Sequence, residues 1–171
     1  MSINTKSKTG TITLYGIMAA LALILSYVEL QIPAFFAIPG MKLGLTNIVV
    51  VVALYTLGEK SAFFINLVRI IVVSILFGNV MALWFSLAGG ILSTLIMIIL
   101  KKTNWFSPVG VSAAGGITHN IGQIIVAIIL LKTSFIIWYL PILWTSGVVS
   151  GVIIGIIGGI VCRHLYSAPK P

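Results

Sequence analysis

Residues 109–131 read VGVSAAGGITHNIGQIIVAIILL and contain no Lys, Arg, Asp or Glu. As a helix, this run is long enough to cross a bilayer core of about 30 Å, and it is too long for a barrel strand. A histidine, an asparagine and a glutamine interrupt it, His119, Asn120 and Gln123. At about 100° per residue they fall within a roughly 100° arc of one helix face. Because an unpaired polar group is costly in hydrocarbon, this face should look into protein or a cavity, and it is the first candidate binding site.

The whole chain shares this apolar character. Of 171 residues, 60% are hydrophobic and 7% are charged, and the mean hydropathy is +1.22, whereas soluble domains carry about 25% charged residues. We therefore predict an all-α integral membrane protein with one transmembrane domain over residues 1–171. Residues 1–10 are expected to form an N-terminal segment, with no cleavable signal peptide, and residues 162–171 a C-terminal tail.

Apolar runs and their breakers predict six helical spans arranged as one bundle. The second span, at about 15 residues, is short for a bilayer core and must exploit bilayer thinning or its flanks. The predicted spans are 11–30, 43–57, 61–77, 80–100, 109–131 and 136–161.

Basic residues indicate how the six spans are oriented. With the N-terminus in the cytoplasm, the outer side carries only Lys42 and Lys132. Because Lys and Arg concentrate on the cytoplasmic side, a multi-pass protein of the cell membrane with both termini cytoplasmic is predicted. The charges form no contiguous patch with interleaved aromatics, so the lipid bilayer is an expected partner and nucleic acid is not. The inner side carries Lys6, Lys8, Lys60, Lys101, Lys102, Arg163 and Lys170.

Acidic residues are nearly absent, which excludes several classes of enzyme. Glu29 and Glu59 are the only acids, and the sequence has no aspartate and no Walker loop. Carboxylate-bound magnesium and paired-carboxylate catalysis therefore lack their ligands, and ATP hydrolysis by the Walker route is excluded. His119 has no cysteine or acid companions at metal-ligand spacing. We expect no catalytic residues, no metal and no cofactor.

Arg69 is the costliest residue to place in a membrane. It lies about 12 Å along the third span from residue 61, whereas Glu29 lies about 27 Å along the first span from residue 11. Parallel helices would keep these two groups apart, so Arg69 should need another partner, such as a carbonyl, water, lipid phosphate or anionic ligand. Asn66, three residues earlier, shares its helix face.

The same arithmetic places polar residues of two spans in one layer. His119 and Gln123 lie about 9 and 15 Å along the fifth span from residue 113, and Arg69 falls between these depths. Three interpretations remain open. The layer is a structural network that fixes helix register, a site of direct ligand contact, or a coupling element to a partner protein.

The second span begins with residues that suit either a ligand or the membrane surface. Lys42 and Thr46 are four residues apart on one face, with Asn47 next to Thr46. A cation and a hydroxyl can meet a ligand entering from outside, but an interfacial lysine that snorkels to headgroups explains Lys42 equally. The preceding residues 35–40 are a candidate lid or a simple connector.

Small residues recur on two spans and indicate close helix packing. On the first span, Gly16 and Ala20 share a face. On the sixth span, whose default neighbour is internal, they are Gly147, Gly151, Gly155 and Gly159.

Two segments, 38–47 and 110–123, together with Arg69 and the run 86–90, resemble a bacterial family. It is the Gx transporter family, also called heptaprenyl diphosphate synthase component I, and it is similar to the S components of energy-coupling factor (ECF) transporters. The resemblance implies six helices, a lid-like first loop and a small-residue motif on the first helix. In this chain that motif corresponds to Gly16 and Ala20, which would dock a transmembrane coupling subunit.

The family names imply two functions. The first is a substrate-capturing membrane transport protein for a small cofactor, vitamin or isoprenoid/quinone-related ligand, energised by partner ATPases. The second is a non-catalytic accessory subunit of a soluble prenyl diphosphate synthase in menaquinone synthesis, because the catalytic subunit needs aspartates that this chain lacks. A purely structural subunit of a redox or lipid complex is a third class.

The predicted orientation can be tested by labelling single cysteines with an impermeant reagent. Cysteines at Lys42 and Lys132 should label from outside the cell, because the positive-inside bias places both outside. Cysteines at Lys60 and Lys101 should label only after the membrane is opened. External labelling at Lys101 would overturn the six-span topology.

Overall fold

The computed structural model describes residues 8–31, 44–133 and 135–167, and within these ranges every regular element is a helix. The all-α prediction is thereby confirmed for the described part of the chain. The elements are α1 (Lys8–Gln31), α2 (Leu45–Thr56), α3 (Glu59–Phe77), α4 (Val80–Thr103), α5 (Pro108–Leu131), a short 3-10 helix η1 (Phe135–Tyr139) and α6 (Leu140–Ser167).

Helices α1, α3, α4, α5 and α6 are long and apolar enough to cross a membrane. Helix α2 is not, because its 12 residues extend only about 18 Å. The predicted span 43–57 is therefore shorter than expected within the described residues, and Lys42, Leu43 and the proposed lid 35–40 lie outside them.

The sixth element also departs from its predicted bounds. The expected span 136–161 begins as η1, and α6 then continues to Ser167, so much of the expected tail from residue 162 is helical. Pro141 explains the break, since proline is tolerated in the first turn of a helix but not in its interior.

Capping residues mark where α4 begins and ends and where α5 begins. The Asn79 side chain accepts a hydrogen bond from the Ala82 amide at 2.8 Å and caps α4. Ser107 caps α5 in the same way, followed by Pro108 in the first turn. Asn104 ends α4 in the left-handed conformation, which asparagine tolerates.

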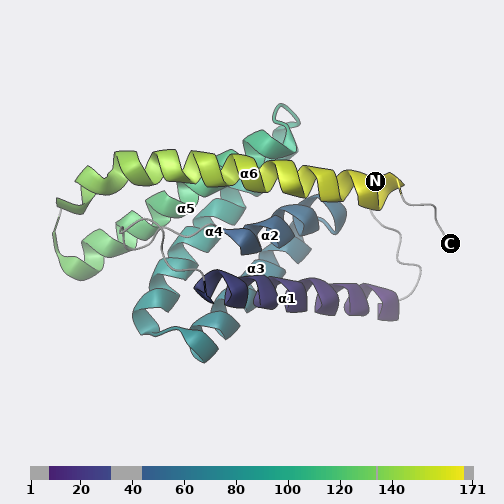
Figure 1. Cartoon of the computed structure of the whole chain (residues 1–171), viewed down its shortest axis with the longest axis horizontal. Helices are drawn as coiled ribbons and strands as arrows, with labels where there is room; N and C mark the ends of the chain where they lie inside the picture. The colour runs from purple at the N-terminus through teal and green to yellow at the C-terminus, as the bar shows by residue number, and fades with distance from the viewer. Residues whose placement is uncertain (1–7, 32–43, 134, 168–171) are drawn as a thin grey trace.

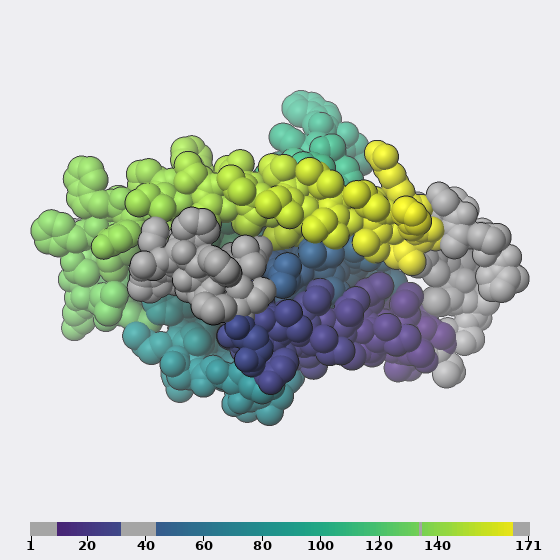
Figure 2. Space-filling model, in the orientation of Figure 1, coloured from purple at the N-terminus to yellow at the C-terminus, as the bar shows by residue number. Residues whose placement is uncertain are grey.

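Helix α2 lies at the centre of the bundle. It packs against α1, α3 and α6, and in Figure 1 it lies between α1 and α6. On the face drawn in Figure 2, α2 is seen only in the gap between those two helices. Its side chains are buried on all sides, as expected for a helix that is apolar all round. It contributes six consecutive residues to the core, none more than 4% exposed, namely Val49, Val50, Val51, Val52, Ala53 and Leu54.

Glycines bring α5 and α6 into close antiparallel contact. A Cβ built on Gly116 would lie 2.2 Å from the Gly147 carbonyl oxygen, and one on Gly151 would lie 2.7 Å from the Ala113 Cα. Only hydrogen fits at these positions, so the backbones touch over several turns. The expectation that this glycine face packs internally is correct for Gly147, Gly151 and Gly155.

Gly159 is the exception to the predicted stripe. A Cβ there meets nothing within 4 Å, whereas Gly158 faces Val51 of α2. Each step of four residues rotates the side chain by about 40°, so three steps turn Gly159 away from α5. Its neighbour Gly158 then takes the buried position against α2.

Gly151 and Gly159 make a matched test of the backbone contact between α5 and α6. Gly151→Ala should lower the thermal unfolding midpoint in detergent, because the new methyl overpacks α5 at a cost of about 1–3 kcal/mol. Gly159→Ala should leave the midpoint unchanged or raise it, since alanine is the better helix former by about 1 kcal/mol. Equal effects of the two changes would contradict this packing.

Candidate functional site

The N-terminus of α2 is held by an acidic side chain from α1. The Glu29 carboxylate accepts a hydrogen bond from the Gly44 amide, and the Thr46 hydroxyl lies 3.5 Å from its other oxygen. The Ser26 hydroxyl is 2.9 Å from that of Thr46. A helix N-terminus carries unsatisfied N–H groups and a partial positive charge, so a carboxylate there stabilises it. Gly44 has φ +75°, a left-handed conformation that favours glycine.

A second polar cluster joins α3 to α4. Arg69 donates from Nε and Nη2 to the Asn66 side-chain oxygen, at 3.2 and 2.6 Å. The Asn66 amide nitrogen donates in turn to the Thr94 hydroxyl at 2.8 Å and to the Gly90 carbonyl at 3.2 Å. Asn66 is 4% exposed, and its bonds to Thr94 and Gly90 are buried, whereas its bonds from Arg69 are partly buried. The cluster satisfies groups that would otherwise be costly to bury.

Arg69 therefore has a hydrogen-bond partner other than Glu29. This agrees with the expectation that the two residues lie at different distances along their helices. No hydrogen bond or ion pair joins Arg69 to Glu29 among the described residues. Two of the five guanidinium donors are used by Asn66, and the others make no hydrogen bond with the residues that the structure describes.

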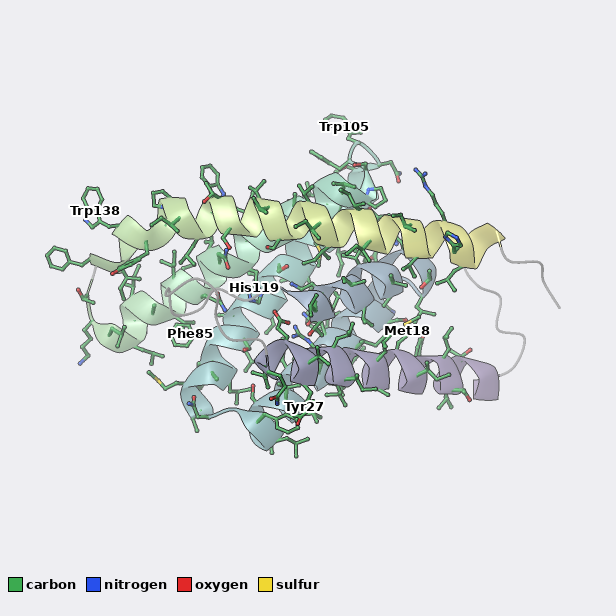
Figure 3. All side chains as sticks on the ribbon, in the orientation of Figure 1. Met18, Tyr27, Phe85, Trp105, His119 and Trp138 are labelled. Carbon is green, nitrogen blue, oxygen red and sulfur yellow. The ribbon has the colours of Figure 1, made fainter. Side chains whose placement is uncertain are left out.

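The three polar residues of α5 contact different neighbours. The His119 ring lies against α4, where a Cβ on Gly89 would be 3.0 Å from it, and Figure 3 shows His119 inside the bundle. The Asn120 amide nitrogen donates to the Leu143 carbonyl of α6. Gln123 is 8% exposed. An arc of about 100° on one helix is wide enough to meet two packed neighbours, and helical spacing alone did not reveal this division.

The glycine pair of α4 relates the α3 cluster to His119. Gly90 faces Asn66, and Gly89 faces His119, so both polar groups adjoin the same turn of α4. Helix arithmetic predicted this kind of common depth for Arg69, His119 and Gln123. The α4 backbone lies between the two groups, however, and their meeting in one ligand cavity stays a prediction.

Asn47 and Lys42 are the remaining binding-site candidates from the sequence. Asn47 lies in the first turn of α2, half-buried, with its amide nitrogen 3.3 Å from a Cβ built on Gly44. Lys42 lies outside the described residues. Sequence reasoning missed the grouping of Glu29, Ser26 and Thr46. The available signal was Glu29 itself, one of only two acids in an apolar chain.

These features define a class of protein, a bundle of apolar, membrane-length helices joined by buried polar contacts. A family model described as heptaprenyl diphosphate synthase component I matches residues 18–161, and the chain belongs to this family. The resemblance noted in the sequence is thereby confirmed. No curated protein and no solved structure gives a significant match.

The contacts of Asn66 predict a structural role that stability measurements can detect. Asn66→Ala should lower stability by about 1–3 kcal/mol, because it leaves the Gly90 carbonyl, Thr94 and Arg69 without this partner. The readout is the thermal unfolding midpoint in detergent, with and without co-purified ligand.

Two variants serve as controls. Asn47→Ala should change the midpoint little, because no hydrogen bond of its side chain joins it to the described residues. Arg69→Lys keeps the positive charge and can keep one bond to Asn66, so its stability should also remain close to that of the unchanged protein. An unaltered midpoint in Asn66→Ala would contradict the network.

Proposed function

We propose that this protein is a membrane transport protein of the S-component type. It captures a small cofactor, vitamin or isoprenoid/quinone-related ligand and relies on partner ATPases for energy. It crosses the cell membrane six times, as one transmembrane domain with cytoplasmic termini. The observation that carries the proposal is the uncovered face of α1. Gly16 and Ala20 are exposed, and a Cβ on Gly16 meets nothing within 4 Å.

That face suits a helix of a coupling subunit. Small residues let two backbones approach closely, and this is the main source of helix association in a bilayer. Helix α1 is also the least covered of the membrane-length helices. In its most apolar stretch 11% of the residues are buried, against 33% for α3. Helix α1 packs mainly on α2 and α3, which leaves its other side for a partner.

The ligand is proposed to meet the polar layer. The unused guanidinium donors of Arg69 offer charge-assisted hydrogen bonds in a low-dielectric interior. An anionic group, a carbonyl oxygen or a quinone oxygen can accept such bonds. The proposed ligand-binding residues are Lys42, Asn47, Asn66, Arg69, His119, Asn120 and Gln123.

The membrane placement has independent support from aromatic residues. Trp105 is 88% exposed and Trp138 is 80% exposed, and Figure 3 shows both projecting from the edge of the molecule. Tryptophan is enriched at membrane–water interfaces, where its ring lies at headgroup level. Trp105 belongs to the α4–α5 connection and Trp138 to η1, as expected for residues at the ends of membrane-length helices.

The second candidate function is a non-catalytic membrane subunit that anchors or supplies a soluble prenyl diphosphate synthase. The family description favours it, since it names a component of such a synthase. The absence of aspartate supports an accessory role, because the chain has no residues for an aspartate-bound magnesium centre.

Co-purification from the native membrane separates the two candidates. Gly16→Leu or Ala20→Leu should abolish recovery of a transmembrane coupling subunit and ATPases, because a leucine prevents close backbone approach. The bundle should stay folded, since the added side chain meets no atom of its own chain at Gly16. Partners and co-purifying ligands are identified by mass spectrometry.

The matched control is Gly159→Leu, a second glycine whose added side chain enters open space, on α6 instead of α1. It should leave recovery of the coupling subunit unchanged. Recovery of a soluble prenyl synthase alone, unaffected by Gly16→Leu and Ala20→Leu, would refute transport and establish the accessory role.

A further inference from the structure

A groove of about 300 Å³ runs between α1 and α3, and the residues that line it come from these two helices. Its walls are apolar and include Ala19 from α1 and Phe64, Ile65 and Val68 from α3. Phe64 is 64% exposed and Val68 44% exposed, so the groove opens along its side. Its volume is at the lower end of the range of ligand sites, about 300–1,000 Å³.

The polar groups of the groove are gathered at one end. Ser61 and Lys60 lie in the first turns of α3, and the Ser61 hydroxyl donates to the Tyr15 hydroxyl oxygen at 2.8 Å. Val68, at the opposite end, is about 12 Å further along α3 than Lys60. The groove is therefore an apolar channel with hydroxyl groups and a cation at one end.

Lys60 keeps its positive charge available. The neighbouring acid, Glu59, is engaged by Lys102 at 3.1 Å, and the Lys101 ammonium donates to the Leu54 carbonyl at 2.6 Å. Within the described ranges Lys60 forms no ion pair or hydrogen bond, and its side chain is exposed. A cation that has no partner among the described residues, at the end of an apolar groove, suits an anionic head with a hydrocarbon tail.

We propose that this groove binds one acyl chain of an anionic phospholipid, with Lys60 at the phosphate. A single cation matches the single charge of a phosphodiester, whereas a prenyl diphosphate would bring more negative charge than the described groove residues balance. The lateral opening lets a bilayer lipid enter without leaving the membrane. This inference rests on the proposed membrane insertion but not on the proposed transport.

Native mass spectrometry of the full chain in neutral detergent tests the site. The probes are dioleoylphosphatidylglycerol, which is anionic, and dioleoylphosphatidylcholine, which is zwitterionic. The unchanged protein should retain the first more strongly. Lys60→Gln should weaken that retention about fivefold, corresponding to about 1 kcal/mol for one lysine at an anionic headgroup. Arg163→Gln is the matched control, because Arg163 is another exposed cation, on α6, and should have no effect.

A second pair of variants tests the groove itself. Ala19→Phe places a ring where the acyl chain would lie and should reduce phosphatidylglycerol retention. Ile24→Phe adds a ring at a 58% exposed position of the same helix and should leave retention unchanged. Thermal unfolding midpoints show whether either variant is misfolded, and Lys60→Gln provides the test if Ala19→Phe is.

Three results would overturn the proposal. Equal retention of the two lipids would remove the role of charge, and equal losses in Lys60→Gln and Arg163→Gln would show diffuse attraction only. Displacement of phosphatidylglycerol by farnesyl diphosphate would assign the groove to a prenyl diphosphate instead. Partner recovery with Gly16→Leu is scored separately, so failure of the lipid site and failure of the transport proposal are distinguishable.

Discussion

The carboxylate of Glu29 at the N-terminus of α2 is the contact on which the centre of the bundle depends. The first turn of α2 lies inside the bundle, where Thr46 is only 1% exposed. The unsatisfied N–H groups there need an acceptor in the absence of water. Glu29 accepts from Gly44, and Thr46 and Ser26 extend the contact back to α1. A charge that is costly to bury is thereby placed where a helix dipole stabilises it.

Helices α4, α5 and α6 are held together by different contacts from those that join α1, α2 and α3. Helices α4, α5 and α6 approach closely through glycines, which gives them extensive van der Waals contact without large side chains. Helices α1, α2 and α3 are joined by larger apolar residues and by polar contacts such as Ser61 with Tyr15. Helix α1 has the smallest buried share of the membrane-length helices, 11% of its most apolar stretch.

Among the described residues, some polar groups hold neighbouring helices together, and Arg69 also has hydrogen-bond donors that its contact with Asn66 does not use. Asn66 and Asn120 are engaged by neighbouring helices, so their first role is to fix helix positions. Arg69 uses part of its guanidinium on Asn66 and keeps further donors. The structural-network and ligand interpretations are therefore compatible, because a preorganised network is what holds a binding group in position. The family to which the chain belongs, heptaprenyl diphosphate synthase component I, is named for a component of a synthase.

The sequence alone determined the helical class, most helix positions and the exclusion of aspartate-dependent chemistry, because composition and the lengths of apolar runs are local properties. It also predicted a similar depth for Arg69 and His119, since rise per residue is constant along a helix. Only the tertiary structure decided which helix each polar group faces. Asn120 meets α6 and His119 meets α4, although the two are adjacent in sequence. The pairing of Glu29 with α2, the turning of Gly159 away from α5 and the groove beside Lys60 likewise depend on how helices cross, and crossing angles are set by packing between segments distant in the chain.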